Sequence, residues 1–328
     1  MKALVSNFPN QIKEAKLIGD STDFTISNKT FNSVLICGLG GSGIGGSIIN
    51  LLLKAEIKIP LVTTNDYAIP EFVNEHTLVI ASSYSGNTEE TLAAVKEGHK
   101  RGAEVVAITS GGELKHLAEI NNWNHLVVPG GEQPRGMLAY SLVQLLFIFQ
   151  KYALIKTDYT STLSEIIELV DSRKSEIQSE AMELAKNIHN KSLVIYGEAS
   201  LEGVLTRFRQ QVNENAKMLC CHHVLPEMNH NELVGWAGSN KDMVVVKLNS
   251  SFDFYRTKKR WEICKGIIGE KTDSIYEIDA VGSSKLTQVL YLIHLTDWIS
   301  CFLADLKNVD SVEVDVIIHL KSELKKLK

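Results

Sequence analysis

Apolar residues gather in short runs, each followed by a turn of small residues and then by a stretch with helical periodicity. One run covers residues 33–37 and another covers 192–196, in the second half of the chain. The first turn leads into a helical pattern over 44–55, and the second into one over 201–219. The repeated order of strand, turn and helix predicts two α/β units of similar plan.

The same alternation continues through both units. It implies mainly parallel sheets that are covered by helices on both faces. The further strand-like runs are 61–64, 77–82, 104–109 and 126–128 in the first unit and 243–248 and 274–278 in the second; the clearest helical patterns are 88–101, an apolar helix from 137, and 286–304.

Glu and Lys alternate with apolar residues at helical spacing from about 160 to 190, which predicts one long helix between the units. We therefore divide the chain into a first domain (1–155), a linking helix (156–190) and a second domain (191–328) that ends in a Lys-rich helix. The 328 residues suit two domains because single cores stop growing beyond about 250–300 residues.

The composition limits the class of protein but says little about its function. With 44 % hydrophobic and 22 % charged residues the chain is typical of globular proteins, and a net charge of −5 disfavours nucleic acid as a partner. Five cysteines without a CxxC pair suit a reducing compartment. The most apolar stretch, 137–150, is shorter than the roughly 20 residues of a membrane span. We expect a cytoplasmic protein without a signal peptide, a membrane partner or a nucleic-acid partner.

Glycine clusters in the turn after the first strand. Residues 38–43 match G-x-G-x-x-G between a predicted strand and a predicted helix, and Asp66 lies at the end of the next strand. This arrangement is typical of a dinucleotide-binding turn. A strand-to-helix turn also uses glycine simply for close packing.

A loop rich in hydroxyl groups follows the strand-like run 77–80. Ser83, Ser85 and Thr88 place three hydroxyls at the predicted start of a helix. Free N–H groups and the helix dipole favour an anion there, so the loop suits a phosphoryl group. Helix capping would account for one hydroxyl and not for the cluster.

Five motifs, in the order GLGGSGIGG, SSYSGNTEET, EQPRG, NENAK and PEMNHNE, resemble those of the bifunctional phosphoglucose/phosphomannose isomerases. This family belongs to the sugar isomerase (SIS) superfamily, and the resemblance runs from about Gly38 to the C-terminus. It implies two SIS domains with doubly wound, mainly parallel, five-stranded sheets, and a homodimer with active sites near the subunit contact. It also implies interconversion of glucose 6-phosphate and mannose 6-phosphate with fructose 6-phosphate, without a cofactor.

The resemblance assigns the grip on the substrate's phosphate to both loops. Gly41 and Ser42 of the glycine turn would hold it together with Ser83, Ser85 and Thr88. Binding the phosphate at a distance from the reacting carbons would hold those carbons in place.

The resemblance also implies four catalytic residues. Glu214 would be the base and Arg135 the cation that faces the enediolate oxygens. His230, supplied by the partner subunit, would open the sugar ring, and Lys321 in the last helix would complete the site. From the residues alone, His222 and His223 are alternatives to His230, and Lys307 is an alternative to Lys321.

Other interpretations stay open at this point. A non-catalytic SIS protein would bind a sugar phosphate without needing Glu214 or His230, and a dehydrogenase would bind NAD(P) at residues 38–43. Three histidines and two cysteines lie between 220 and 230. Because neighbouring side chains in regular structure point in different directions, we predict no metal site there.

Overall fold

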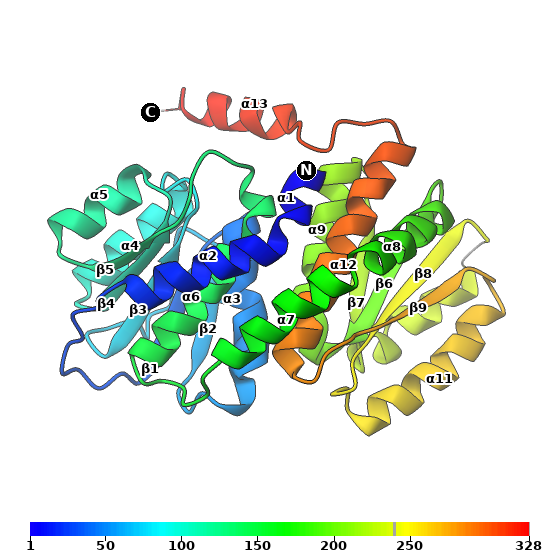
Figure 1. The fold of residues 1–328 in the computed structure, drawn as a ribbon, viewed down its shortest axis with the longest axis horizontal. Coiled ribbons are helices and arrows are strands. Elements are labelled where there is room, and N and C mark those ends of the chain that lie inside the picture. The colour runs from blue at the N-terminus through cyan, green and yellow to red at the C-terminus, as the bar shows by residue number, and fades with distance from the viewer. Residues whose placement is uncertain (239–240, 328) are drawn as a thin grey trace.

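Two parallel β-sheets flanked by helices form the protein in the computed structural model, which describes residues 1–238 and 241–327 (Figure 1). Sheet A has the strand order β2-β1-β3-β4-β5, and sheet B has the order β7-β6-β8-β9. The predicted α/β class is therefore confirmed. The strands are β1 (Ser33–Cys37), β2 (Leu61–Thr64), β3 (Thr77–Ser82), β4 (Glu104–Thr109), β5 (Asn124–Val127), β6 (Ser192–Glu198), β7 (Cys221–Leu225), β8 (Met243–Asn249) and β9 (Ile275–Asp279).

Sheet B has four strands in the described part of the chain, one fewer than the resemblance implies. In sheet A the chain passes from β4 through a helix and β5 before it enters helix α6. In sheet B only residues 280–284 separate β9 from helix α12. A parallel crossover needs a dozen or more residues, so this segment cannot add a fifth strand.

Helices cover both faces of sheet A: α4 and α5 pack on one face, and α3 and α6 pack on the other. The core on the α3 side continues without a break into sheet B, where α8, α9 and α12 cover one face. The helices are α1 (Lys2–Ser6), α2 (Phe8–Ser21), α3 (Gly40–Leu52), α4 (Glu89–Lys100), α5 (Gly112–Ile120), α6 (Leu138–Lys151), α7 (Thr160–Ser172), α8 (Lys174–Ile188), α9 (Glu202–Ala216), α10 (Glu232–Gly235), α11 (Tyr255–Gly269), α12 (Lys285–Leu306) and α13 (Asp315–Leu324).

The segment predicted as one linking helix contains two, α7 and α8, which are separated at Arg173. Helix α7 packs on α2 and α12, and α8 packs along α12. The division lets each helix bury its own apolar stripe, with Leu163, Ile166 and Val170 of α7 among the buried side chains.

Helix α12 is the central helix of the molecule. By length and composition it is the single described helix that could cross a membrane, but 89 % of its most apolar window is buried inside the fold. Its apolar side chains thus belong to the core that both sheets share.

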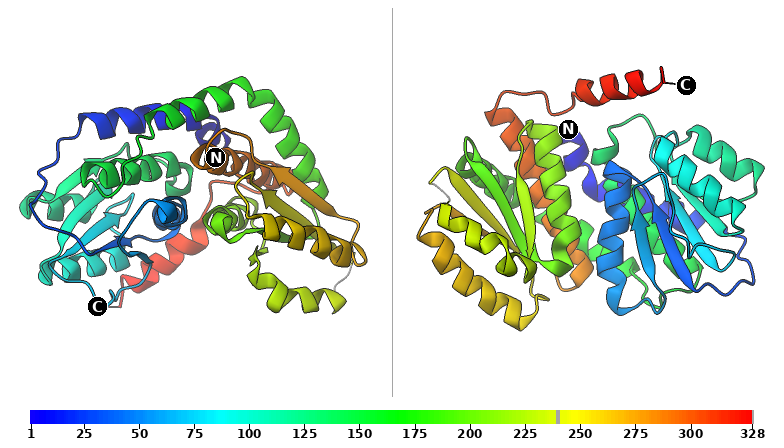
Figure 2. Two further views of the ribbon diagram at one scale, coloured as in Figure 1. Left: turned by 90° about the horizontal axis from the view of Figure 1, so that it is seen from below. Right: turned by 180° about the vertical axis from the view of Figure 1, so that it is seen from behind.

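Helices α3 and α9 join the two halves of the molecule. A Cβ atom at Gly203 of α9 would lie 3.1 Å from the backbone nitrogen of Ile48 on α3, so the two helices approach backbone to backbone. Residues 307–314 connect α12 to helix α13, which lies over the half of the molecule that contains sheet A (Figure 2), and the residues of α13 are exposed.

Candidate active site

The hydroxyl loop lies between β3 and α4, where the sequence predicts it. The Oγ of Ser83 and the Oγ1 of Thr88 are 2.9 Å apart, and the Oγ of Ser85 accepts a hydrogen bond from the backbone N–H of Asn87 at 3.2 Å. Thr88 is the N-cap residue of α4, yet its side chain accepts no hydrogen bond from the helix backbone. The hydroxyl cluster therefore lies at a helix N-terminus without being used up in capping.

The glycine turn packs directly against the hydroxyl loop. The backbone N–H of Tyr84 donates to the Oγ of Ser42 at 3.0 Å, and the Oγ of Ser82 donates to the carbonyl of Ser42 at 3.2 Å. The first turn of α3, which holds Gly41, contacts a third segment. A Cβ at Gly41 would lie 3.0 Å from the backbone nitrogen of Arg135 and 3.1 Å from its Cα.

Arg135 lies in the short 3₁₀ helix Pro134–Gly136 and is only 4 % exposed. Its Nε donates to the Oδ1 of Asn215 at 2.8 Å, and its Nη1 donates to the Oε1 of Gln133 at 3.2 Å. Its Nη2 donates to the carbonyls of Ser311 and Val312, in the segment between α12 and α13, at 2.6 and 3.3 Å. The guanidinium is thus held in one orientation by partners from three parts of the chain.

Glu214 lies beside this guanidinium, near the end of α9. Its Oε2 is 3.3 Å from the Nη1 of Arg135, and its side chain is 31 % exposed, so it is partly buried. Burial lowers the pKa of Arg135, and the nearby Glu214 carboxylate opposes that shift. The structure therefore brings together a carboxylate and a buried cation that the sequence places 79 positions apart (214 − 135).

Lys217 follows Glu214 at the end of the same helix. It has a left-handed backbone, with φ of 52°, and its Nζ donates to the carbonyl of Glu214 at 2.7 Å. The same Nζ donates to the carbonyl of Glu313 at 2.5 Å, in the segment that also contacts Arg135. Lys217 thus ties the end of α9 to the chain that leads into α13.

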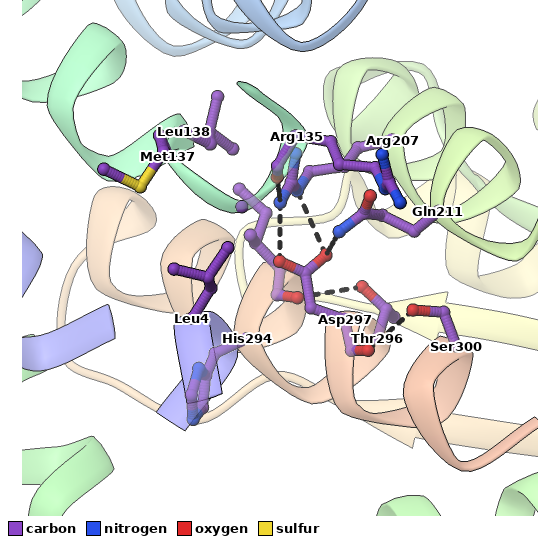
Figure 3. A network of polar contacts seen from close by, with 12 residues as sticks. Leu4, Arg135, Met137, Leu138, Arg207, Gln211, His294, Thr296, Asp297 and Ser300 are labelled. Carbon is purple, nitrogen blue, oxygen red and sulfur yellow. Dashed lines mark hydrogen bonds and ion pairs between the residues drawn. The ribbon is translucent and has the colours of Figure 1, made fainter. Parts of the chain in front are cut away.

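A buried polar network formed by residues of α9 and α12 contacts the backbone of Arg135 (Figure 3). Arg207 of α9 donates to both carboxylate oxygens of Asp297 on α12, at 3.1 and 2.6 Å, and to the carbonyl of Arg135 at 2.9 Å. Gln211 donates to the Oδ1 of Asp297 at 3.0 Å. Burial raises the pKa of Asp297, while Arg207 and Gln211 oppose that rise.

His230 is exposed and lies beyond the beginning of α9, away from Glu214. Strand β7 passes α9 in the opposite direction, because Cys220 contacts Asn213 near the end of α9 and His222 contacts Thr206 near its beginning. The chain then leaves β7 and reaches His230 in the 3₁₀ helix Glu227–His230, beyond the beginning of α9. Within one chain, His230 is therefore separated from Glu214 by roughly 18 Å of helix, at 1.5 Å per residue.

Neither candidate lysine contacts Glu214 or Arg135 in any described hydrogen bond or ion pair. Lys321 is exposed on α13, and Lys307 is half-buried at the end of α12.

Of the alternatives to His230, His222 contacts Thr206, whereas the Nδ1 of His223 lies 3.0 Å from the Oε2 of Glu232. Burial lowers the pKa of His222 to about 4.

Sequence reasoning assigned no role in the site to Gln133, Arg207, Asn215 or Lys217. Three of the four stand inside the motifs EQPRG and NENAK, so those motifs contained a usable signal. Arg207 lies outside both motifs, and no signal in the sequence marked it as part of the site.

Two further features of the described part of the chain concern metal binding and a cavity outside the candidate site. No group of three or more His, Cys, Asp or Glu side chains that could hold a metal ion occurs there. A cavity of about 480 Å³ lies between α11 and the ends of β8 and β9, lined in part by Lys247, Asp253 and Trp261, and it contains none of the predicted site residues.

Two doubly wound parallel sheets, with a hydroxyl loop at a helix N-terminus beside a guanidinium–carboxylate pair, define a protein of the SIS-domain class. The family described as "Bacterial phospho-glucose isomerase C-terminal SIS domain" matches residues 177–324. Among solved structures, the C-terminal domain of glucosamine-fructose-6-phosphate aminotransferase from Francisella tularensis has a TM-score of 0.75 at 13 % identity, covering 94 % of this chain and 97 % of that one. Tagatose-6-phosphate ketose/aldose isomerase from Escherichia coli has a TM-score of 0.69 at 15 % identity, covering 95 % and 94 %. These likenesses show the fold.

Curated relatives are similar over nearly the whole chain. The bifunctional phosphoglucose/phosphomannose isomerase of Caldicellulosiruptor bescii is 36 % identical over 99 % of this chain and 98 % of its own length. The protein of the same name from Thermoplasma acidophilum is 36 % identical over 95 % of this chain and 96 % of its own. The chain belongs to the bifunctional phosphoglucose/phosphomannose isomerase family, as its motifs predict.

Proposed function

We propose that the protein interconverts glucose 6-phosphate and mannose 6-phosphate with fructose 6-phosphate. The observation that carries the proposal is the pair formed by Glu214 and the buried Arg135, whose side chains approach to 3.3 Å. The backbone of Arg135 also packs against the proposed phosphate-binding turn at Gly41. The names of the full-length relatives support the same substrates.

In the proposed mechanism, Glu214 removes the proton from C2 of the open-chain aldose and returns it to C1, while the hydroxyl proton on O2 passes to O1. The electron pair left by the C2 proton forms the enediolate, and its negative charge develops on oxygens that face the Arg135 guanidinium. The same enediolate serves both aldoses, because they differ only in the configuration at C2. Ser42, Ser83, Ser85, Thr88 and the N–H of Gly41 hold the phosphate.

Ring opening is assigned to His230 of a second subunit. In one chain His230 and Glu214 lie at opposite ends of α9, so an active site that contains both needs two copies of the protein. The dimer is therefore proposed as part of the catalytic unit. Lys321 is proposed to join the site from α13, whose exposed position leaves it free to approach.

The remaining proposals concern the domains of the protein, its location in the cell and its need for a cofactor. Residues 1–155 and 191–328, which contain sheets A and B, act as two domains joined by 156–190. Five free cysteines support a reducing, cytoplasmic location. The reaction requires no metal or nucleotide, so EDTA is expected to leave turnover unchanged.

The test is a coupled assay that follows glucose 6-phosphate formed from fructose 6-phosphate. Glu214→Gln is expected to lower kcat by about 10²–10⁴, the range typical of positioned proton transfer. Glu202→Gln, which changes an exposed carboxylate on the same helix, is the matched control and should keep the wild-type rate. Turnover of Glu214→Gln within about tenfold of wild type would contradict the role of Glu214. A wild-type protein that binds the sugar phosphate without turnover would instead be a non-catalytic SIS protein.

The shared site has its own test. Glu214→Gln and His230→Gln chains, each nearly inactive alone, are unfolded, mixed in equal amounts and refolded. If His230 acts across the interface, about a quarter of the wild-type activity returns, because half of the dimers are mixed and each has one intact site. Mixtures without recovered activity would place His230 in its own chain's site or outside any site.

A further inference from the structure

We propose that Arg207 is a positioning residue for the reaction: anchored by Asp297, it fixes the backbone of Arg135 and, through that backbone, the phosphate-binding turn. The inference rests on the proposed role of Arg135 in isomerisation. It adds to that proposal a residue that touches neither the substrate nor the reacting atoms.

The contacts of Arg207 point to this role. Its side chain is 3 % exposed, and that of Asp297 is 6 % exposed. One Nη2 atom serves both partners, donating to the Oδ2 of Asp297 at 2.6 Å and to the carbonyl of Arg135 at 2.9 Å (Figure 3). The planar guanidinium can hold a carboxylate in two places and still reach a carbonyl, which a lysine cannot do.

Stability alone does not account for this pair. Desolvating two charges costs roughly as much as their attraction returns, so a buried ion pair is weak evidence for stabilisation of the fold. What the pair achieves specifically is to aim a fixed donor at the carbonyl of Arg135, the residue that carries the proposed cation.

The same two helices also hold the side chain of Arg135. Asn215 of α9 accepts from the Nε of Arg135 and donates to the Oγ of Ser300 on α12, which donates in turn to the carbonyl of Asp297. Arg207 thus holds the backbone of Arg135, and Asn215 holds its side chain, both anchored to one turn of α12.

The effect extends to the phosphate-binding turn because Gly41 packs on the backbone of Arg135. If that backbone moves, both the guanidinium and the turn shift relative to the substrate. A misplacement of about 1 Å far from the chemistry can lower a rate about 10²-fold.

The experiment is a double-mutant cycle of Arg207→Lys and Arg135→Lys, with kcat and KM for fructose 6-phosphate measured well below the unfolding temperature. Arg207→Lys alone is expected to lower kcat by about tenfold to a hundredfold. In the Arg135→Lys background, its effect on kcat should fall below about threefold, because residues that act as a unit are not additive. Two effects that simply multiply would overturn the inference, as would a folded Arg207→Lys protein with wild-type kcat.

Lys247 and Asp253 supply a matched control, since they form another buried ion pair, 2 % and 3 % exposed, within the second domain. Lys247→Arg should change the unfolding temperature and leave kcat unaltered. If Arg207→Lys does not fold, Gln211→Leu, which removes one hydrogen bond from Asp297, takes its place in the cycle. Wild-type protein that fails to isomerise sugar phosphates would refute the proposed function itself, before any variant is compared.

Discussion

Replacing Gly41 by alanine tests whether the glycine turn, the proposed phosphate-binding turn, and Arg135 are positioned by each other. The added Cβ would lie 3.0 Å from the nitrogen of Arg135, 3.1 Å from its Cα and 3.1 Å from the carbonyl carbon of Pro134. All three are backbone atoms, which cannot rotate away as a side chain can. Ordinary contact begins at 3.4 Å, so the two segments must separate by about 0.4 Å or more.

That displacement sets the expected size of the effect. Since a shift of about 1 Å can cost about 10²-fold, we expect Gly41→Ala to lower kcat/KM for fructose 6-phosphate about tenfold to a hundredfold. The assay is the same coupled measurement, with folding checked by circular dichroism and by the unfolding temperature.

Gly45→Ala is the control on the same helix. Its added Cβ would meet the Oγ of Ser141 at 3.3 Å and leucine methyl groups at 3.6 Å, all of which can adjust. Both variants gain up to about 1 kcal/mol of helix propensity, so a difference in activity between them reports the contact with Arg135. Equal kcat/KM values for the two variants, within threefold, would refute the reasoning.

Other consequences can be measured independently. Thr88→Val keeps the shape of the side chain but removes the hydroxyl that pairs with Ser83, so KM for fructose 6-phosphate should rise about tenfold, with a small change in kcat. Wild-type KM in that variant would remove Thr88 from the phosphate site. Burial, together with the charge of Lys174, lowers the pKa of His294 to about 3, whereas an unfolded histidine titrates near 6.5. The unfolded chain therefore takes up a proton that the folded chain refuses, and the free energy of unfolding should fall by about 2 kcal/mol between pH 7 and pH 5. His294→Phe, which retains a ring against Phe8, should lose that part of the pH dependence in urea titrations, and an unchanged dependence would show that other groups cause it.

The elements of the fold that the sequence predicts best are those whose burial is uniform. Strands β1 and β3 are buried at every residue and stand out as apolar runs. Strand β7 was not predicted, because this edge strand carries Cys221, His222 and His223 and is largely half-exposed. The break between α7 and α8 was also missed, since neither glycine nor proline marks Arg173.

Some residues of the candidate site could likewise be predicted from the sequence, and others could not. Motifs with unusual composition, such as the hydroxyl loop and the glycine turn, could be recognised because few structural roles require them. Arg207 and Asp297 could not, because a charged residue on a helix normally indicates an exposed face. Only the packing of α9 against α12 shows that both side chains are buried and that Arg207, held by Asp297, donates to the carbonyl of Arg135.

The orientation of the two halves explains why catalysis would need a second chain. Helices α3 and α9 pack side by side and run in opposite directions, which brings the first turn of α3, at the end of sheet A that holds the phosphate loops, next to the end of α9, where Glu214 lies. The same arrangement carries the loop after β7, with His230, to the opposite end of α9. This geometry places the proposed phosphate-binding loops next to Glu214, the proposed base, and separates Glu214 from His230, the proposed group for ring opening. In the proposed dimer, a second copy that presents its own His230 would resolve this separation without any change in the fold.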